Sequence, residues 1–170
     1  MVKFRFAKKG KELYLAKQRL AFLKAVSGDS VSERPSKIGQ LLVSYFKDAL
    51  AEETRRCVIA EAEGKTVGQG TVFFYRSAPS FHNPEGINAY ITSVFVEPGW
   101  RRRGIAARIL SLLEAEAEKR GCRGVLLHPS KEGEALYSAL SFEFCSPLMM
   151  LNVKEELLSC WKQSVFSCGR

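Results

Sequence analysis

A short turn rich in arginine, Arg101 to Ala106, carries the clearest chemical signal in this sequence. Three consecutive arginines precede Gly104, and the turn joins a β-branched run to an amphipathic helix. The first N–H groups of a helix have no partner within it, and the helix dipole adds partial positive charge there. Glycine permits backbone angles and close approaches that other residues block. We therefore interpret the turn as an anion site that cradles a pyrophosphate.

The spacing within this turn excludes the two common phosphate loops. A P-loop requires Gly-x-x-x-x-Gly-Lys-Ser/Thr, and a dinucleotide loop requires Gly-x-Gly-x-x-Gly. The observed pattern, Arg101-x-x-Gly104-x-Ala106, resembles instead the cofactor motif Gln/Arg-x-x-Gly-x-Gly/Ala of the GNAT family of N-acetyltransferases. A valine-rich strand that ends at Glu97-Pro98 and a following helix strengthen the resemblance. The alternative is a basic loop that only caps a helix.

The resemblance implies a cofactor site between two strands. In the GNAT fold the strand before the motif and the strand after its helix separate; here these are residues 89–96 and 124–128. The pantetheine arm of coenzyme A would pair with the backbone of Val94 and Val96, as a peptide pairs at a sheet edge. The Val94 N–H would act as an oxyanion donor, contributing about 3 kcal/mol; the alternative is two ordinary core valines. The pyrophosphate would contact Arg101, Arg102, Arg103, Gly104, Ile105 and Ala106.

A second segment, residues 133–142, resembles the Leu-Tyr-x-x-x-Gly-Phe segment of the same family. Leu136, Tyr137 and Phe142 match it, whereas Ser141 replaces the glycine, at a cost of roughly 1 kcal/mol if the backbone there is left-handed. The resemblance places Tyr137 near the coenzyme A sulfur, where it can protonate the leaving thiolate. Ordinary pKa values of ~8.5 for a thiol and ~10 for a tyrosine make that transfer mildly uphill. The alternative is a core tyrosine with a satisfied hydroxyl.

No general base for an acceptor amine stands out. Some relatives use a glutamate on the central strand, but Tyr90 occupies that position here. Thr92 and Ser93 could hold a water that relays the proton. His128 and His82 are further candidates, although a strand-end histidine is more often structural.

The acceptor site is expected between two loops, residues 27–37 and 76–88, and the exposed face of the central strand. Their carboxylates could attract a cationic amine or be ordinary solvated groups; they are Asp29, Glu33 and Glu85. Ser130, which follows the second strand, could hydrogen-bond the pantetheine or cap the next helix.

Length and composition fit one globular domain of 170 residues with 46% hydrophobic and 26% charged residues. No apolar run approaches the ~20 residues of a membrane span, and the basic N-terminus lacks the apolar core of a signal peptide. We therefore expect a cytoplasmic protein. Five scattered cysteines without a Cys-x-x-Cys pair favour free thiols and no metal site.

The order of strands and helices predicts an α/β fold with a mixed, mostly antiparallel sheet, and the resemblance adds separated central parallel strands flanked by helices. Predicted strands are residues 2–6, a hairpin over 57–75 that turns near 63–65, 89–96, 124–128, and one or two within 144–152. The short apolar run 124–128 is typical of a buried parallel strand. Predicted helices are residues 11–26, about 36–53, 105–121, 133–140 and 153–166, and Ser36 can cap the second of them. Helical spacing predicts one buried face on each of the first two helices: Leu13, Ala16, Leu20 and Leu23 on the first, and Ile38, Leu41, Leu42, Tyr45, Phe46 and Ala49 on the second. The predicted core spans about residues 2–152, and the 153–170 helical extension should pack on its own domain or on a second subunit.

These features predict an N-acetyltransferase that moves an acetyl group from acetyl-coenzyme A to a primary amine of a small molecule or peptide. Direct attack in a ternary complex is expected, because the motif strand and turn contain no cysteine that could carry the acyl group. One alternative is a non-catalytic acyl-coenzyme A-binding or regulatory module of the same fold. The other, suggested only by the net charge of +8, is a nucleic-acid-binding protein.

Overall fold

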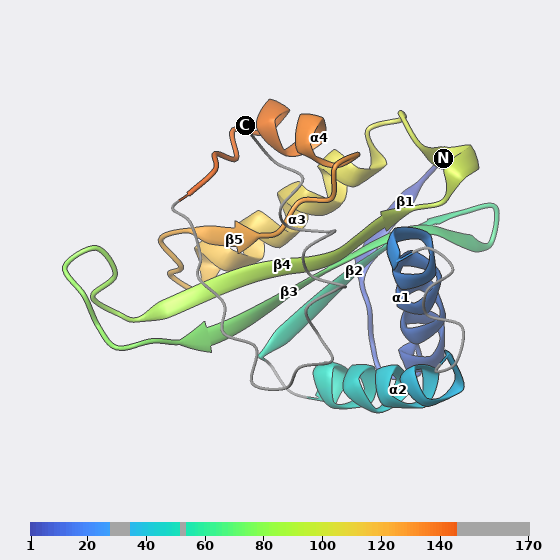
Figure 1. The fold of residues 1–170 in the computed structure, drawn as a ribbon, viewed down its shortest axis with the longest axis horizontal. Coiled ribbons are helices and arrows are strands. Elements are labelled where there is room, and N and C mark those ends of the chain that lie inside the picture. Colours follow the sequence, from blue (N-terminus) through green and yellow to red (C-terminus); the bar gives the residue numbers. More distant parts are fainter. Residues whose placement is uncertain (28–34, 52–53, 146–170) are drawn as a thin grey trace.

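The computed structural model describes residues 1–27, 35–51 and 54–145, which form one five-stranded sheet with helices on both faces (Figure 1). The elements are β1 (Lys3–Phe6), α1 (Glu12–Ser27), α2 (Pro35–Ala51), β2 (Arg55–Ala62), β3 (Lys65–Arg76), β4 (Ile87–Val96), the 3₁₀ turn η2 (Pro98–Trp100), α3 (Ile105–Lys119), β5 (Val125–Leu127) and α4 (Glu134–Ala139). The strands lie in the order β1-β2-β3-β4-β5, and only β4 and β5 are parallel. The predicted class and element order are confirmed through α4.

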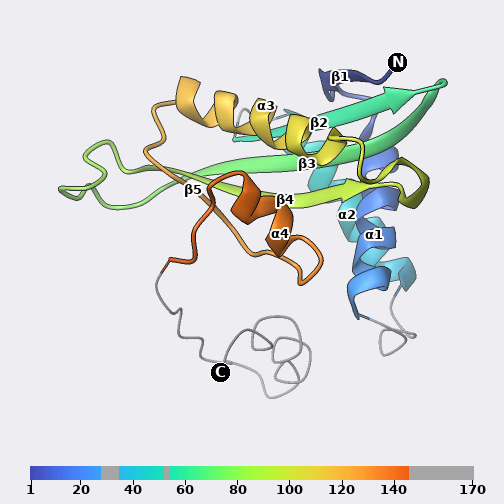
Figure 2. The same cartoon turned by 90° about the horizontal axis from the view of Figure 1, so that it is seen from above.

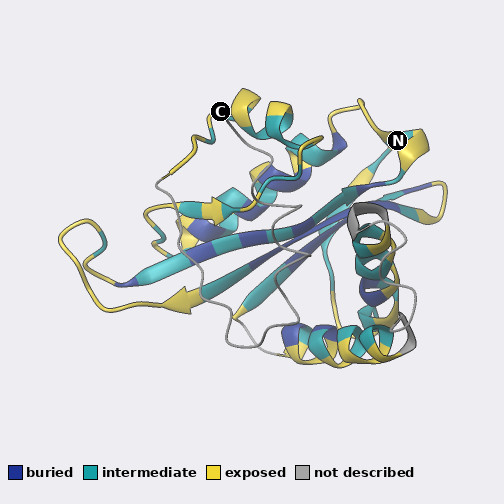
Figure 3. Cartoon of the chain, in the orientation of Figure 1, coloured by how far each residue is buried: buried dark blue, intermediate teal, exposed yellow. Residues whose placement is uncertain are grey.

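The middle of the sheet is buried on both faces. Figure 2 shows α3 on one side of the sheet and α1 and α2 on the other. Successive residues of β2 alternate between these layers: Val58 and Ala60 belong to the α3 core, whereas Cys57 and Ile59 belong to the core under α1 and α2. Burial is accordingly concentrated along the middle of β2 and β3 (Figure 3). No helix in the described ranges is long and apolar enough to cross a membrane.

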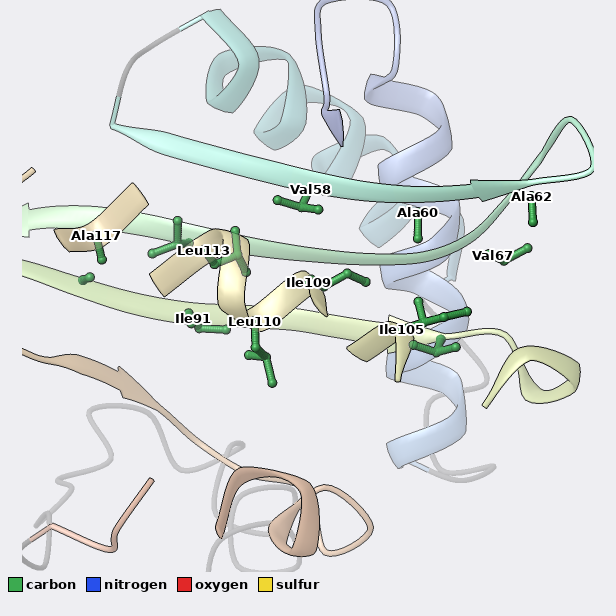
Figure 4. Packing of buried hydrophobic residues seen from close by; sticks show 13 residues of the cluster. Val58, Ala60, Ala62, Val67, Ile91, Ile105, Ile109, Leu110, Leu113 and Ala117 are labelled. Atoms are coloured by element: carbon green, nitrogen blue, oxygen red, sulfur yellow. The ribbon is translucent and has the colours of Figure 1, made fainter. Parts of the chain in front are cut away.

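Helix α3 packs directly on the backbone of β3. A Cβ atom added at Gly70 would lie 2.6 Å from Cγ2 of Ile109 and 3.1 Å from Cδ1 of Leu113. Both side chains are fully buried, and Figure 4 shows them between α3 and the sheet. A glycine is therefore required at this position, because the helix occupies the space of a side chain.

We expect Gly70→Ala to lower the free energy of unfolding by about 1–3 kcal/mol, because the new methyl group forces Ile109 out of its packed position. Gly39→Ala is the matched control. It lies within α2, and its Cβ would make only an ordinary contact of 3.8 Å with Leu20. Alanine is the better helix former, so this control should raise stability by about 0.5–1 kcal/mol. Denaturant unfolding of both variants measures the difference, and equal effects of the same sign would contradict the packing argument.

Strand β4 contains a bulge that fixes the direction of its second half. Gly70 of β3 lies opposite both Ser93 and Val94, one residue more than regular pairing allows, and Ser93 has φ 57°. An extra residue reverses the alternation of side chains along a strand. Ile91 before the bulge and Val94 and Val96 after it all pack in the α3 core. Without the bulge, the latter two would point to the opposite face.

Several predicted boundaries shift in the structure. The β3–β4 loop is residues 77–86 rather than 76–88, because both strands extend further. Strand β5 spans three residues rather than 124–128. The prediction that it is buried is wrong, since Leu126 is 43% exposed. Helix α2 begins at Pro35, so Ser36 lies inside the helix instead of capping it.

Two predicted helix faces need one correction each. On α1, Leu13 is 58% exposed, while Leu15 is fully buried in its place. On α2, Leu41 is 57% exposed, whereas Phe46 and Ala49 are buried as expected. Apolar residues of α1 are distributed around the helix, so periodicity alone did not select the buried side.

Some predictions concern residues outside the described ranges. These are most of the 27–37 loop, including Asp29 and Glu33, and the C-terminal helix over residues 153–166. Of the strands expected within 144–152, only Phe144 and Cys145 are described, and neither belongs to a strand.

Candidate active site

The arginine-rich turn connects the end of β4 to the start of α3. Arg102 has φ 61° and Gly104 has φ 73°, so both adopt a left-handed backbone, which disfavours side chains. Gly104 is the N-cap of α3 and offers no capping side chain. A Cβ atom built on it would meet nothing within 4 Å and would enter the open space before the helix. The glycine thus keeps the approach to the helix start clear.

The N–H groups of this turn are available to a ligand. The first helical hydrogen bond runs from the Arg108 N–H to the Gly104 carbonyl at 3.0 Å. Within the part of the chain that the structure describes, the N–H groups of residues 102–107 have no backbone acceptor outside regular elements. Such a group of donors at a helix N-terminus suits a pyrophosphate, and the residues present therefore fit the cradle that the motif predicts.

The arginine side chains divide into two kinds. Arg101 donates its Nε–H to the Val96 carbonyl at 3.1 Å, so this side chain fastens the turn to the end of β4. The Arg103 guanidinium lies 4.8 Å from the ring centroid of Trp100. All four arginines are exposed, but Arg102 and Arg108 make no such contact within the described residues. We expect any side-chain contact with phosphates to come chiefly from these two exposed arginines, with backbone N–H groups supplying the rest.

The parallel strands separate beside this turn. Pairing of β4 with β5 ends at Ile91 and Leu127. Beyond that point, no strand among the described residues pairs with residues 92–96 on the β5 side, and the Val96 carbonyl accepts the Arg101 side chain instead. Backbone groups that lack a partner need a substitute. Val94 and Val96, the residues expected to pair with pantetheine, lie in this unpaired half, while their side chains remain in the core.

Helix α4 returns the chain to the α3 core, because Leu136, Tyr137 and Leu140 pack against it. Ser130 starts the turn into the helix: its carbonyl accepts the N–H groups of Gly133 at 2.8 Å and Glu134 at 3.1 Å. The Ser130 hydroxyl does not cap α4, whose N-cap is Gly133 and has no side-chain bond.

The end of α4 is a Schellman motif with serine in the glycine position. Phe142 N–H donates to the Tyr137 carbonyl at 3.0 Å, and Ser141 N–H donates to the Ser138 carbonyl at 3.0 Å. Ser141 has φ 64°, so the left-handed backbone considered from the sequence is present. The rings of Tyr137 and Phe142 meet edge to face with centroids 5.8 Å apart. Phe142 therefore holds the predicted acid in place despite the serine.

We expect Ser141→Gly to stabilise the protein by about 0.5–1 kcal/mol, because glycine adopts the left-handed backbone without strain. Ser138→Gly is the control, since it places the same substitution inside the helix, where glycine is unfavourable. Thermal unfolding should shift upward for the first variant and downward for the second. A lower melting temperature for Ser141→Gly would contradict the role assigned to this cap.

Tyr137 is half-buried over Gly133, where a Cβ atom would lie 2.9 Å from Cε2 of its ring. The same Cβ position is 3.3 Å from the hydroxyl of Ser130, so Ser130 and Tyr137 flank one small residue. Burial raises the pKa of Tyr137. The phenol therefore keeps its proton at neutral pH and can act only as a donor there, as a general acid must.

On the α1 side of the gap, Tyr90 occupies the position of the glutamate found in some relatives. A hydrogen bond joins its hydroxyl to Nδ1 of His128, which is exposed at the end of β5. Ser93 is buried and Thr92 is half-buried, so both lie near the gap with little access to bulk water. Of the polar residues considered for proton transfer, the structure brings together Tyr90 and His128.

The β3–β4 loop does not approach this site. Residues 77–86 project at the end of β4 opposite the arginine-rich turn (Figure 1). His82 is exposed there, and Glu85 pairs with Arg123 at 3.5 Å. The prediction that this loop lines the acceptor site is therefore wrong, because the extension of β3 and β4 carries it away.

Sequence reasoning missed Arg19 of α1, a half-buried arginine on the α1 side of the sheet. Its guanidinium lies 5.1 Å from the ring centroid of Phe22. One signal could have identified it: the residues one turn away, Leu15, Ala16 and Leu23, are all apolar. A charge with only apolar helical neighbours is a candidate for a buried role.

A mixed sheet that opens between two parallel strands, beside a helix start that can bind an anion, defines the acyl-coenzyme A N-acyltransferase fold. The model of the GNAT acetyltransferase family matches residues 23–142. The chain therefore belongs to the GNAT family, as the sequence motifs indicate.

Solved structures agree with this assignment. A predicted acetyltransferase from Clostridium acetobutylicum, solved with acetyl-coenzyme A, is 26% identical, with a TM-score of 0.82 over 90% of this chain and 97% of its own. A GCN5-related N-acetyltransferase from Ralstonia eutropha JMP134 is 18% identical, with a TM-score of 0.81 over 91% and 100%. An aminoglycoside N-acetyltransferase in complex with coenzyme A is 17% identical, with a TM-score of 0.69 over 89% and 94%. No curated protein sequence matches the chain significantly.

Proposed function

We propose that this protein is an N-acetyltransferase that transfers an acetyl group from acetyl-coenzyme A to a primary amine. The observation that carries the proposal is the opening between β4 and β5 beside the start of α3, where no side chain caps the helix. The acetyl-coenzyme A bound by the Clostridium acetobutylicum relative supports the choice of cofactor.

The residues have separate roles in this proposal. Backbone N–H groups of Arg102, Arg103, Gly104, Ile105 and Ala106 hold the pyrophosphate, with Arg101 fastening the turn. The backbone of Val94 and Val96, which β5 does not pair, would hold the pantetheine, and the Val94 N–H would donate to the carbonyl oxygen of the thioester. Ser130 borders the pantetheine, and Tyr137 holds a proton on its hydroxyl oxygen for the departing sulfur.

Acetyl-coenzyme A, when bound, supplies a thioester: the amine nitrogen forms a bond to the acetyl carbon, the carbon–sulfur bond breaks, the nitrogen loses a proton and the sulfur gains one. The proton lost by nitrogen needs an acceptor, and Tyr90 with His128 or a water near Ser93 are the candidates. In this proposal the acid lies on α4, and the base lies on β4 or at the end of β5, on the side of the sheet that α1 covers.

Direct transfer is favoured over an acyl-cysteine by the three cysteines that lie within the described ranges. Cys57 is fully buried under α2, and its sulfur accepts a hydrogen bond from Thr71 at 3.3 Å. Burial raises the pKa of Cys57 to about 11, so it is a thiol and not a nucleophilic thiolate at neutral pH. Cys122 is half-buried behind α3, away from the opening, and Cys145 lies beyond α4.

The second candidate function is a non-catalytic acyl-coenzyme A-binding module, which the tyrosine at the glutamate position favours. Release of free thiol from acetyl-coenzyme A distinguishes the two. We expect amine-dependent thiol release in a screen of amino acids, peptide N-termini, amino sugars, polyamines and aminoglycosides. Tight coenzyme A binding without turnover of any amine would support the binding module, and a strongly salt-dependent affinity for DNA or RNA would indicate a nucleic-acid-binding protein.

A further inference from the structure

Three aromatic rings stand in a row beside the opening: Phe73 of β3, Tyr90 of β4 and His128 after the end of β5. We call this row the aromatic wall. Phe73 and Tyr90 pair directly across the two strands, and their ring centroids are 5.1 Å apart. The centroids of Tyr90 and His128 are 5.7 Å apart, and the Tyr90 hydroxyl is hydrogen-bonded to Nδ1 of His128. The wall is therefore one continuous surface across neighbouring parts of the sheet.

Alternation along the strands places the whole wall on the face of the sheet opposite α3. Each wall residue has a sequence neighbour in the α3 core, and these neighbours are Val72, Ile91 and Leu127. Adjacent residues of a strand point to opposite faces. Tyr137 and the rest of α4 pack on the α3 side. A nucleophile that attacks a thioester held in the opening would therefore approach from the side of the wall.

The polar end of the wall is at the opening. Pairing of β4 with β5 ends at Ile91 and Leu127, the residues next to Tyr90 and His128. The phenol and the imidazole, which can exchange a proton, thus lie beside the point where the strands separate. Phe73 lies one strand further away, on β3. A molecule bound along the wall would have its polar group at the opening and its apolar part over Phe73.

The wall is not part of either hydrophobic core. Phe73 and Tyr90 belong to neither cluster of core residues in the described part of the chain, whereas the ring of Phe74 packs against the α3 core. The rings of Phe73 and Tyr90 are half-buried, and His128 is exposed. Rings that contact one another beside an opening, outside both cores, have the composition of a ligand-binding surface: mostly apolar area with a few polar groups at one end.

Aromatic rings favour one kind of acceptor. A ring that packs on another ring gains more than the burial of an equal apolar area, because the electron-rich face of one attracts the edge of the other. The same faces attract an ammonium group, which is the form of most alkylamines at neutral pH. An amine attached to an aromatic ring therefore suits the wall better than an aliphatic amine of the same size.

We propose that the acceptor is an amine joined by a short chain to an aromatic ring, that this ring stacks on Phe73 and Tyr90, and that the nitrogen points to the Tyr90–His128 hydrogen bond at the opening. The proposal rests on the proposed acetyltransferase function and names its substrate class. Phe73 is then a specificity-determining residue. It is also the one wall residue that cannot exchange a proton, so its replacement tests binding separately from proton transfer.

Three acceptors of graded structure test the proposal: phenylethylamine, cyclohexylethylamine and butylamine. We expect kcat/KM for phenylethylamine to exceed that for cyclohexylethylamine by about 2–10-fold, the range for a contact between aromatic rings. It should exceed that for butylamine by about 10–100-fold, because butylamine has no ring to bury. Equal values for the two ring amines, or a higher value for cyclohexylethylamine or butylamine, would overturn the proposal.

Three variants locate the effect. Phe73→Leu keeps an apolar side chain without a ring, so it should remove the preference for phenyl over cyclohexyl and leave turnover of butylamine within about twofold. Phe73→Tyr keeps the ring and should keep the preference. Phe74→Leu is the matched control, because it makes the same substitution one residue along, on the α3 face. It should lower the melting temperature and leave the preference unchanged. A wild-type preference in a folded Phe73→Leu protein would exclude Phe73 as the binding surface.

Binding without chemistry separates failure of this inference from failure of the proposed function. Phenylethanol and cyclohexylethanol keep the two ring types but have no amine. NMR titration of the coenzyme A-saturated protein should show tighter binding of phenylethanol, and Phe73→Leu should lose the difference. If no amine is turned over but this difference is found, the acetyltransferase function fails and the aromatic site stands. If amines are turned over but both alcohols bind equally, or neither binds, the aromatic site fails alone.

Discussion

Replacing Tyr137 by Phe should lower turnover by about 10²–10³-fold with little change in coenzyme A affinity, the range for removal of an acid–base group. The substitution removes one oxygen and keeps the ring, so the contact with Phe142 and the packing on the α3 core are retained. Steady-state kinetics with a confirmed acceptor, together with calorimetry of coenzyme A binding, measures both quantities.

The pH profile gives a second test of this role. The group acts in its protonated form, and burial raises its pKa above the ordinary value of ~10. Activity should therefore persist throughout the neutral range and decline only at a pH above that raised pKa. Tyr137→Phe should lack this alkaline decline. Tyr75→Phe is the control, because Tyr75 is exposed near the far end of β3 and should keep the wild-type rate. Wild-type turnover in Tyr137→Phe would show that Tyr137 is not the general acid and only packs in the core.

Gly104→Val should weaken coenzyme A binding by at least about 10–100-fold, which corresponds to roughly 1.4–2.8 kcal/mol. The valine side chain would enter the open space before α3, where the pyrophosphate is proposed to lie, and φ 73° at this position disfavours any β-branched residue. Some loss of stability is also expected from this strain, so the melting temperature must be measured beside the affinity.

Gly99→Val is the matched control for this prediction. Gly99 belongs to the same connection, a Cβ atom on it would also meet nothing within 4 Å, and its φ is not positive. It should therefore accept valine with wild-type affinity. Equal losses in both variants would indicate general damage to the turn, and unchanged affinity in a folded Gly104→Val protein would refute the phosphate cradle.

Local patterns predicted the parts of the site that depend on neighbouring residues in the sequence. The arginine-rich turn follows from the spacing of Arg101, Gly104 and Ala106, and the left-handed cap from the position of Ser141. The turn and the cap each involve a few consecutive residues, and local backbone geometry determines their conformation. The order of the elements follows for the same reason, since hydrophobic periodicity is local.

The remaining features depend on contacts between distant segments. Ile91 and Val94 are an odd number of residues apart, so in a regular strand they would face opposite sides of the sheet. The bulge at Ser93 lets both face the same core, and no residue type in the sequence indicates it. Arg19 acquires its surroundings from the packing of α1 beside β4, which lies far along the chain from it. The exposure of β5 depends on what covers it, which its apolar sequence cannot specify.

The short pairing between β4 and β5 has a consequence for local opening of the molecule. Within residues 54–145, only three residue pairs attach β5 to the sheet, so β5 should be among the first strands to lose amide protection in hydrogen exchange, well before β2 and β3. The proposed general acid lies on α4, just after this weakly attached strand. A ligand that pairs with the free half of β4 would add hydrogen bonds where the protein has few, and binding to the folded state alone would slow exchange there. Protection of β5 and α4 would then rise with ligand concentration, so the segment that carries Tyr137 would be held firmly against the sheet only when there is a thioester for it to act on.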